Sequence, residues 1–150
     1  ADWTLVGEVK NNPRMKIPVF GNGDIDSPEK AKMYKDRYGV DGIMIGRASI
    51  GYPWIFREIK HYLKTGTLLP EPTIAERVDA ARRHLVHSID WKGEKVGVVE
   101  MRRHYTNYFR SLEGIKHFRS ILVSESNPDV LFEVLEQIGN HYSPELIESF

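Results

Sequence analysis

Residues 17–63 read IPVFGNGDIDSPEKAKMYKDRYGVDGIMIGRASIGYPWIFREIKHYL, and this stretch decides the fold class. Two short apolar runs, 16–20 and 42–45, each end in a glycine-containing turn and predict buried strands. Ser27-Pro28 predicts a helix start after the first strand, because serine caps a helix and proline fits its first turn. A second helix is predicted over about 53–64. The order is therefore strand, helix, strand, helix.

Continuous apolar strands that alternate with helices predict a parallel sheet covered by helices. Two strands do not make such a sheet stable by themselves, and a complete (β/α)8 barrel needs roughly 200 residues or more. We therefore predict that residues 1–66 form a piece of a larger TIM barrel, an α/β architecture.

The strand pattern stops after a proline- and glycine-containing segment, 64–72, and helical patterns follow it. Thr73 and Glu76 form a capping-box pattern at the start of the first of these helices. Residues 67–150 are predicted as an all-α bundle domain, so that the chain is mostly helical. Further helices are expected over about 95–112, around 115–122, from Asn127-Pro128 to a stop at Gly139, and from Ser143-Pro144.

Composition excludes several classes of protein. The 150 residues contain no cysteine, which excludes disulfides, thiolate metal sites and a cysteine nucleophile in this chain. No apolar run approaches the roughly 20 residues of a membrane span, and no signal segment opens the chain, so we expect a cytoplasmic protein without a membrane partner. His84 and His87 share a helix but lack a third ligand, so no metal site is predicted.

Charge is segregated although it sums to zero. Residues 82–119 hold nine Lys and Arg against four Asp and Glu, whereas residues 120–150 hold six acids and neither Lys nor Arg. A basic block of this kind suits a polyanion such as RNA. Alternatively, the two blocks pair with each other inside the helical domain.

The turns after the two predicted strands share a chemical character. Gly21-Asn22-Gly23-Asp24 precedes a helix, and Gly46-Arg47-Ala48-Ser49 precedes another. Glycine lets backbone N–H groups approach a ligand, and helix N-termini favour phosphate. A phosphate site at the ends of consecutive parallel strands is one interpretation; ordinary turns are the other.

The stretch 17–63 resembles the tRNA-dihydrouridine synthases, in particular their bacterial DusB-like branch. The resemblance rests on the NGDI turn at 22–25, GVDGIMIGR at 39–47 and PWIFREI at 53–59, with MRRHY at 101–105 as a weaker motif. It covers nearly the whole chain but only the last part of a family member. It implies FMN as cofactor, NADPH as reductant and a uridine of tRNA as substrate.

The resemblance also implies roles for residues. Asn22, Gly23, Asp24, Gly46 and Arg47 would hold the flavin phosphate. The family's catalytic cysteine has no counterpart here, so this chain offers no catalytic residue. We expect it to be inactive alone, to bind FMN weakly or not at all, and to self-associate through its exposed barrel edge.

The helical domain would contact tRNA. Arg103, Asn107 and Arg110 fall at i, i+4 and i+7 on one predicted helical face, while Tyr105 and Tyr108 face the core. The candidate RNA-binding residues are Arg102, Arg103, Arg110, Lys116 and Arg119.

Two other functions stay open. One is a different FMN-dependent barrel reductase acting on a small molecule, although the basic helical region argues against it. The other is a non-catalytic helical RNA-binding or interaction module. Trp91, which precedes Lys92-Gly93 near a helix end, indicates no function.

Overall fold

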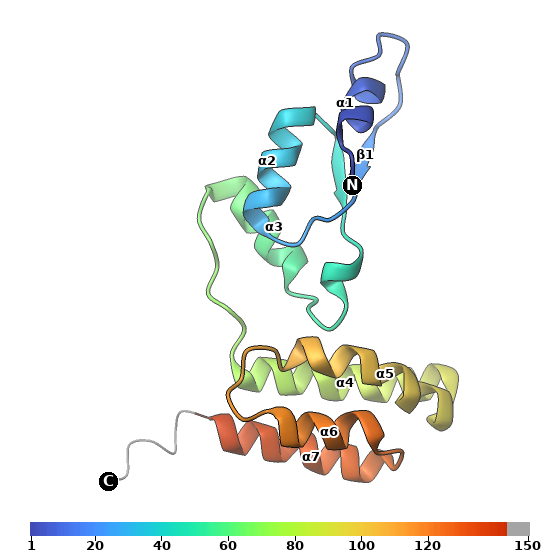
Figure 1. The fold of residues 1–150 in the computed structure, drawn as a ribbon, viewed down its shortest axis with the longest axis vertical. Helices are drawn as coiled ribbons and strands as arrows, with labels where there is room; N and C mark the ends of the chain where they lie inside the picture. The colour runs from blue at the N-terminus through green and yellow to red at the C-terminus, as the bar shows by residue number, and fades with distance from the viewer. Residues whose placement is uncertain (144–150) are drawn as a thin grey trace. The chain divides into compact units, whose positions relative to one another are not determined.

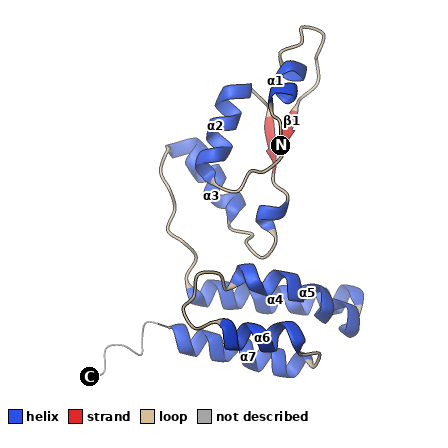
Figure 2. Ribbon diagram, viewed as in Figure 1, coloured by secondary structure: helices blue, strands red, loops and turns tan. Residues whose placement is uncertain are grey.

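A computed structural model describes residues 1–143, which form seven α-helices, one short 3₁₀ helix and a small parallel sheet. The chain divides into two compact units on either side of the Pro70–Glu71 bond. We call Ala1–Pro70 the N-terminal unit and the residues from Glu71 on the C-terminal unit. The mostly helical content with a parallel strand pair confirms the coarse fold class (Figures 1 and 2). The N-terminal unit contains α1 (Thr4–Lys10), β1 (Phe20–Asn22), α2 (Pro28–Tyr38), β2 (Gly42–Met44), η1 (Arg47–Ser49) and α3 (Ile55–Thr65).

The sheet consists of β1 and β2, paired in parallel with Phe20 opposite Gly42 and Asn22 opposite Met44. The parallel pairing was predicted, but the limits of the first strand were wrong. It begins at Phe20 rather than at residue 16, and it contains two residues that we assigned to the turn. Ile17, before the strand, and Phe20, its first residue, are 70% and 66% exposed.

The helices of this unit follow their predicted caps closely. The hydroxyl of Ser27 accepts a hydrogen bond from the Lys30 N–H, and α2 ends at Gly39 in the left-handed conformation, with φ of 65°. The predicted second helix starts two residues late, at Ile55, because Pro53 and Trp54 form the turn before it. α2 packs against α3, and both lie beside the sheet (Figure 1).

Trp3 anchors the segment before α1 on the sheet. Its side chain is only 2% exposed, and its indole Nε1 donates to the Gly23 carbonyl over 2.9 Å. The indole ring lies 4.8 Å from the Tyr34 ring and so reaches α2. A Cβ on Gly21 would come within 2.0 Å of this indole, which explains the glycine in β1.

The C-terminal unit packs four helices: α4 (Ile74–Lys92), α5 (Glu94–Tyr108), α6 (Lys116–Ser124) and α7 (Pro128–Tyr142). Each helix contacts the next along the chain, and α7 returns to contact α4. The predicted capping box at Thr73 and Glu76 is present. Side chains from all four helices make the core: Leu85, Val98, Met101, Tyr105, Leu122, Leu131, Leu135 and Ile138.

Two predicted helix ends in this unit were wrong. α5 stops at Tyr108 rather than near 112, because Phe109 turns into the core and Ser111 adopts a positive φ of 62°. α7 continues through Gly139 to Tyr142. The helix predicted from Ser143-Pro144 lies outside the described residues. No helix among residues 1–143 is long and apolar enough to cross a membrane.

Candidate functional site

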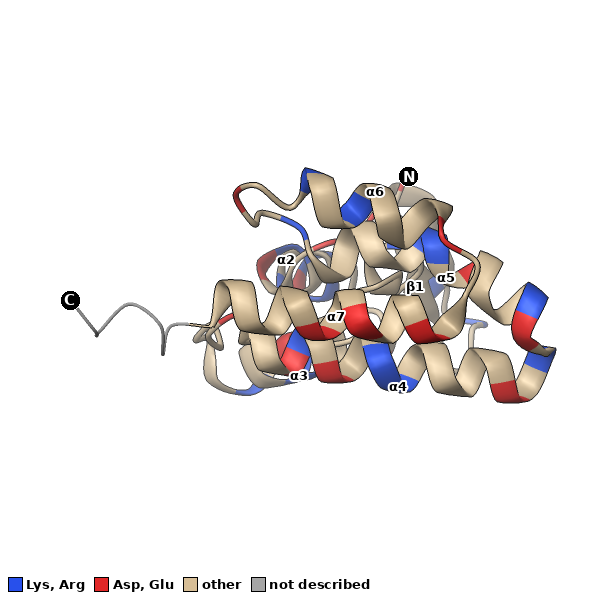
Figure 3. Ribbon diagram, turned by 90° about the horizontal axis from the view of Figure 1, so that it is seen from below, with Lys and Arg blue, Asp and Glu red and all other residues tan. Residues whose placement is uncertain are grey.

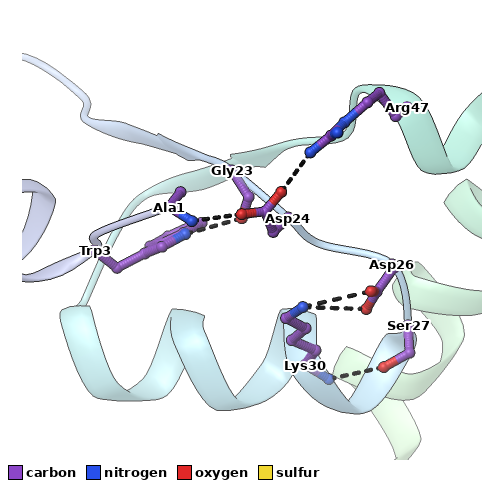
Figure 4. Close-up of polar contacts among 8 residues, drawn as sticks. All are labelled: Ala1, Trp3, Gly23, Asp24, Asp26, Ser27, Lys30 and Arg47. Carbon is purple, nitrogen blue, oxygen red and sulfur yellow. Dashed lines mark hydrogen bonds and ion pairs between the residues drawn. The ribbon is translucent and has the colours of Figure 1, made fainter.

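The ends of the two strands bring the predicted phosphate-binding turns together. Because β1 and β2 are parallel, the residues that follow them emerge at the same edge of the sheet. The Arg47 guanidinium donates to Asp24 Oδ1 over 2.6 Å, so the two turns face each other (Figure 4). Asn22 is the last residue of β1 and is exposed there. The structure thus brings Asn22, Gly23, Asp24, Gly46 and Arg47 into one neighbourhood.

Asp24 holds a negative charge at this edge. Its carboxylate accepts hydrogen bonds from the N-terminal ammonium of Ala1 and from Arg47. The ammonium first, and Arg47 after it, lower the pKa of the Asp24 carboxyl from its ordinary value. An incoming anion therefore meets a guanidinium that already has a carboxylate partner. Asp24 also adopts a positive φ of 54°, which aspartate tolerates better than most residues.

The second turn fits an oxyanion better than the first. A Cβ on Gly46 would meet no atom within 4 Å, and the Arg47 side chain is 88% exposed. Among the described residues, the backbone N–H groups of Gly46 and Arg47 donate no hydrogen bond. By contrast, a Cβ on Gly23 would lie 2.2 Å from the side chain of Ala1, so that turn is already filled.

The helix N-termini contribute less than predicted. The second turn leads into η1, a 3₁₀ helix of three residues, and α3 begins only at Ile55. At α2, the Ser27 hydroxyl takes up the Lys30 N–H, and the Asp26 carboxylate pairs with the Lys30 ammonium over 3.4 Å (Figure 4). Any phosphate site here would therefore depend on the Gly46–Arg47 turn and not on a helix dipole.

A separate apolar cavity of about 200 Å³ lies between β2 and the helices of the N-terminal unit. None of the five predicted cofactor residues lines it. Its walls include Lys35, Asp41, Ile43, Phe56, Ile59 and Leu63.

The five candidate RNA-binding residues divide into two groups. Arg103, Arg110 and Lys116 are exposed, whereas Arg102 and Arg119 are half-buried with their Nε atoms enclosed and without a hydrogen-bond partner. The Arg102 guanidinium donates to the Ser124 and Glu125 carbonyls at the end of α6, each over 3.3 Å. Arg102 therefore joins α5 to α6.

The expected helical face of Arg103, Asn107 and Arg110 needs correction. Arg110 lies beyond the end of α5, in the turn toward α6, so the three residues do not share one helix. The Arg110 carbonyl accepts a hydrogen bond from the Arg77 guanidinium over 3.1 Å. That bond fixes the backbone from which the Arg110 side chain projects.

The ion pairs described in residues 71–143 do not join the basic block, residues 82–119, to the acidic block, residues 120–150. Arg83 pairs with Asp79 over 2.7 Å, and Lys92 pairs with Glu100. Both carboxylates lie before the acidic block of residues 120–150. Acidic positions lie along α7, and basic positions lie on α6 (Figure 3). The described pairs therefore leave the acids of α7 outside the basic block.

Comparison with known proteins shows the family. The model of the dihydrouridine synthase family matches residues 1–142, through both units. The chain belongs to the dihydrouridine synthase family. The resemblance inferred from the sequence motifs is thereby confirmed.

Named relatives agree with this membership. The chain is 39% identical over 143 residues to a probable tRNA-dihydrouridine synthase of Rickettsia conorii, covering 95% of this chain and 42% of the relative. It is 43% identical over 120 residues to tRNA-dihydrouridine synthase B of Pseudomonas aeruginosa, covering 80% and 36%. It is 44% identical over 120 residues to tRNA-dihydrouridine synthase B of Pseudomonas putida, covering 80% of this chain and 35% of the relative. The chain thus spans roughly two-fifths or less of the length of these synthases.

One cluster in this chain was missed by sequence reasoning. The His84 and His104 rings lie 4.5 Å apart between α4 and α5, and His84 Nδ1 is 3.1 Å from the Tyr108 hydroxyl. Burial lowers the pKa of both histidines, and that of His104 falls to about 4. Contacts across a helix hairpin leave no local spacing signal. Among the described residues, no group of three potential ligands could hold a metal ion.

Proposed function

We propose that this chain supplies the C-terminal part of a flavin-dependent tRNA-dihydrouridine synthase, an oxidoreductase that reduces uridine in tRNA. The family match through both units carries the proposal. In this proposal residues 1–66 are the last βα units of a (β/α)8 barrel, and residues 67–150 are a helical bundle domain that contacts tRNA. The parallel pairing of β1 and β2 supports the barrel assignment.

The proposed cofactor site lies at the edge where the two strands end. Bound FMN would supply the hydride chemistry, with NADPH as reductant. The N–H groups of Gly46 and Arg47 would donate to the flavin phosphate, and the Arg47 guanidinium would add a positive charge. Asp24 would orient Arg47 through the 2.6 Å contact, and Asn22 and Gly23 would border the phosphate from β1.

Chemistry on the uracil ring would need groups that this chain lacks. Its sequence contains no cysteine, and the proposal assigns no catalytic residue to it. We therefore expect the purified chain to reduce no uridine in tRNA when FMN and NADPH are added. Dihydrouridine formation, measured by mass spectrometry of the digested tRNA, would contradict this proposal.

Phosphate binding at the Gly46–Arg47 turn can be tested separately. We expect weak binding of FMN, with millimolar FMN shifting the amide resonances of Gly46 and Arg47, and inorganic phosphate shifting the same two. Arg47→Ala should abolish both shifts, whereas Arg57→Ala in α3 should preserve them. Shifts that persist in Arg47→Ala would show that the phosphate binds elsewhere.

The proposed RNA surface comprises Arg102, Arg103, Arg110, Lys116 and Arg119. The three exposed members would contact phosphates directly, while Arg102 and Arg119 would shape the surface from half-buried positions. Charge reversal at Arg103 and Arg110 should weaken tRNA binding and reduce the salt slope by about one per lost phosphate contact. Lys64→Glu in the N-terminal unit is the matched control. Unchanged binding in the double variant would place the RNA surface elsewhere.

A second candidate function is a non-catalytic RNA-binding module. The filled space at Gly23 and the carboxylate of Asp24 favour it for the chain in isolation, because both oppose an anionic cofactor. Filter binding of tRNA, combined with titration of the Gly46 and Arg47 amides by millimolar FMN, separates the two functions. Binding of tRNA without any shift of these amides favours the module, whereas their shift favours the enzyme part.

A further inference from the structure

Trp91 is the most exposed large apolar side chain among the described residues. It lies at the end of α4, next to the turn into α5, and 82% of its surface is open to solvent. The other two tryptophans, Trp3 and Trp54, are buried. The core formed by the described residues of the C-terminal unit is closed without Trp91, so packing among residues 71–143 does not explain an indole at this position.

Basic and aromatic groups continue from Trp91 along the α4–α5 hairpin. The Lys92 ammonium lies 4.9 Å from the centroid of the Trp91 ring and also pairs with Glu100. One turn further along α5, Arg103 Nε donates to His104 Nε2 over 3.2 Å. The field of both Lys92 and Arg103 reaches the imidazole of His104. We call Trp91, Lys92, Arg103 and His104 the hairpin strip.

The hairpin strip has the chemistry of an unpaired-base contact. Unpaired RNA bases stack on aromatic side chains, and arginine or lysine neutralises the phosphates beside them. The Glu100 carboxylate pairs with the Lys92 ammonium, whereas Arg103 is exposed and donates to His104. A base-paired helix would meet the strip differently, because its bases are not free to stack on the indole.

We propose that the hairpin strip is an RNA contact in which the indole of Trp91 stacks on an unpaired base and the exposed Arg103 binds an adjoining phosphate, while Lys92, held by Glu100, adds positive charge beside the indole. This rests on the proposed tRNA function and deepens it. It adds a base contact that the candidate set of arginines and lysines did not include. Each stacked base contributes roughly 1–3 kcal/mol, which corresponds to a change of about fivefold to 150-fold in affinity.

Intrinsic fluorescence tests the contact directly, because Trp91 is the exposed tryptophan of the three. In the full 150-residue chain, an unmodified tRNA transcript should quench Trp91 emission and lower its accessibility to acrylamide by about half or more. Trp91→Phe should remove the accessible component of the emission. If tRNA binds by filter assay while Trp91 stays fully accessible, the stacking proposal is wrong and the wider RNA function stands. If no tRNA binds at all, both fail together.

Affinities of substituted chains supply the second test. Trp91→Ala should weaken tRNA binding about tenfold, Trp91→Phe should retain most of the affinity, and Val86→Ala should act as the exposed control on the same helix. None of the three should affect binding of a blunt RNA duplex that lacks unpaired bases. Equal losses on tRNA and duplex in Trp91→Ala would overturn stacking in favour of a nonspecific contact. Protection of Trp91 by anionic lipid vesicles but not by tRNA would overturn the RNA assignment.

Discussion

At the residue scale, Arg77 is the clearest case of a charge that stabilises the fold rather than a ligand. Its side chain is 5% exposed, and its guanidinium donates to the Pro72 and Arg110 carbonyls and to the Glu71 carboxylate. Buried guanidinium groups are stable only when their N–H groups are satisfied in this way. Arg77 thereby joins the start of the C-terminal unit to the turn after α5.

Replacing Arg77 by Met should therefore destabilise the C-terminal unit. The methionine keeps much of the apolar stem but leaves two carbonyls without their donor, so we expect a loss of about 2–4 kcal/mol. Urea denaturation followed by circular dichroism measures it. Arg83→Met, which breaks only the exposed pair with Asp79, should cost about 0.5 kcal/mol or less. Equal losses in the two variants would contradict the buried role of Arg77.

His104 should make stability depend on pH. Its pKa is lowered from 6.5 to about 4, first by burial and then by the field of His84 and Arg103. Below neutral pH the unfolded chain therefore takes up a proton before the folded chain does, so stability should fall between about pH 7 and pH 4. Melting temperatures across this range should fall less steeply for His104→Gln than for the original chain. A slope that His104→Gln leaves unchanged would refute the assignment.

At the element scale, the close approach of α4 and α5 depends on Gly97. A Cβ there would lie 2.6 Å from the Ser88 carbonyl oxygen and 2.7 Å from the Ile89 nitrogen, both backbone atoms that cannot rotate away. The Ser88 hydroxyl also donates to the Gly97 carbonyl over 3.1 Å. The hairpin therefore requires glycine near the start of α5, against helix propensity.

Gly97→Ala and Gly139→Ala form a matched pair of substitutions. Alanine gains about 1 kcal/mol of helix propensity at either position, but at Gly97 the backbone clash should exceed this gain and destabilise the unit by about 1–3 kcal/mol. At Gly139 the nearest atom, from Val78, lies 3.8 Å away, so the propensity gain should persist. Thermal denaturation of both variants measures the difference. Stabilisation by Gly97→Ala would show that the helices can move apart without cost.

At the scale of the whole molecule, the chain consists of two units connected through residues 67–72. Leu68 in this segment is 57% exposed, and residues 67–73 belong to no helix or strand. We expect thermolysin to cut there first and to release a C-terminal product that keeps its helical circular dichroism. Early cuts within α4 or α5 would contradict two separately compact units.

The open side of the sheet predicts self-association. Met44 in β2 and Ile17, which precedes β1, are exposed beside a two-stranded sheet whose outer edges carry unpaired backbone groups. We expect the purified chain to form dimers or larger species, and Ile17→Ser with Met44→Ser to reduce their amount. Light scattering measures the mass. A clean monomer of the original chain at high concentration would contradict this prediction.

Local signals explain which elements could be predicted. The caps at Ser27, Thr73 and Asn127 act within one helical turn, so reading the neighbouring residues was sufficient. The end of α5 was predicted wrongly because Leu112 continues the apolar period of the helix, whereas in the structure Phe109 fills the core position. The turns at Asp24 and Arg47 were predicted to be neighbours from strand order, yet their mutual ion pair depends on atoms 23 residues apart.

The sequence by itself determined the order of strands and helices, the capped starts of α2, α4 and α7, and the family, because these depend on short-range spacing and on motifs. Only the tertiary structure decided that Trp3 fills the space over Gly21, that Arg102 and Arg77 bind backbone carbonyls, and that Trp91 stays outside the core. The physical reason is that burial and partner choice depend on which surfaces meet. Which surfaces meet is determined by residues that are far apart in the chain.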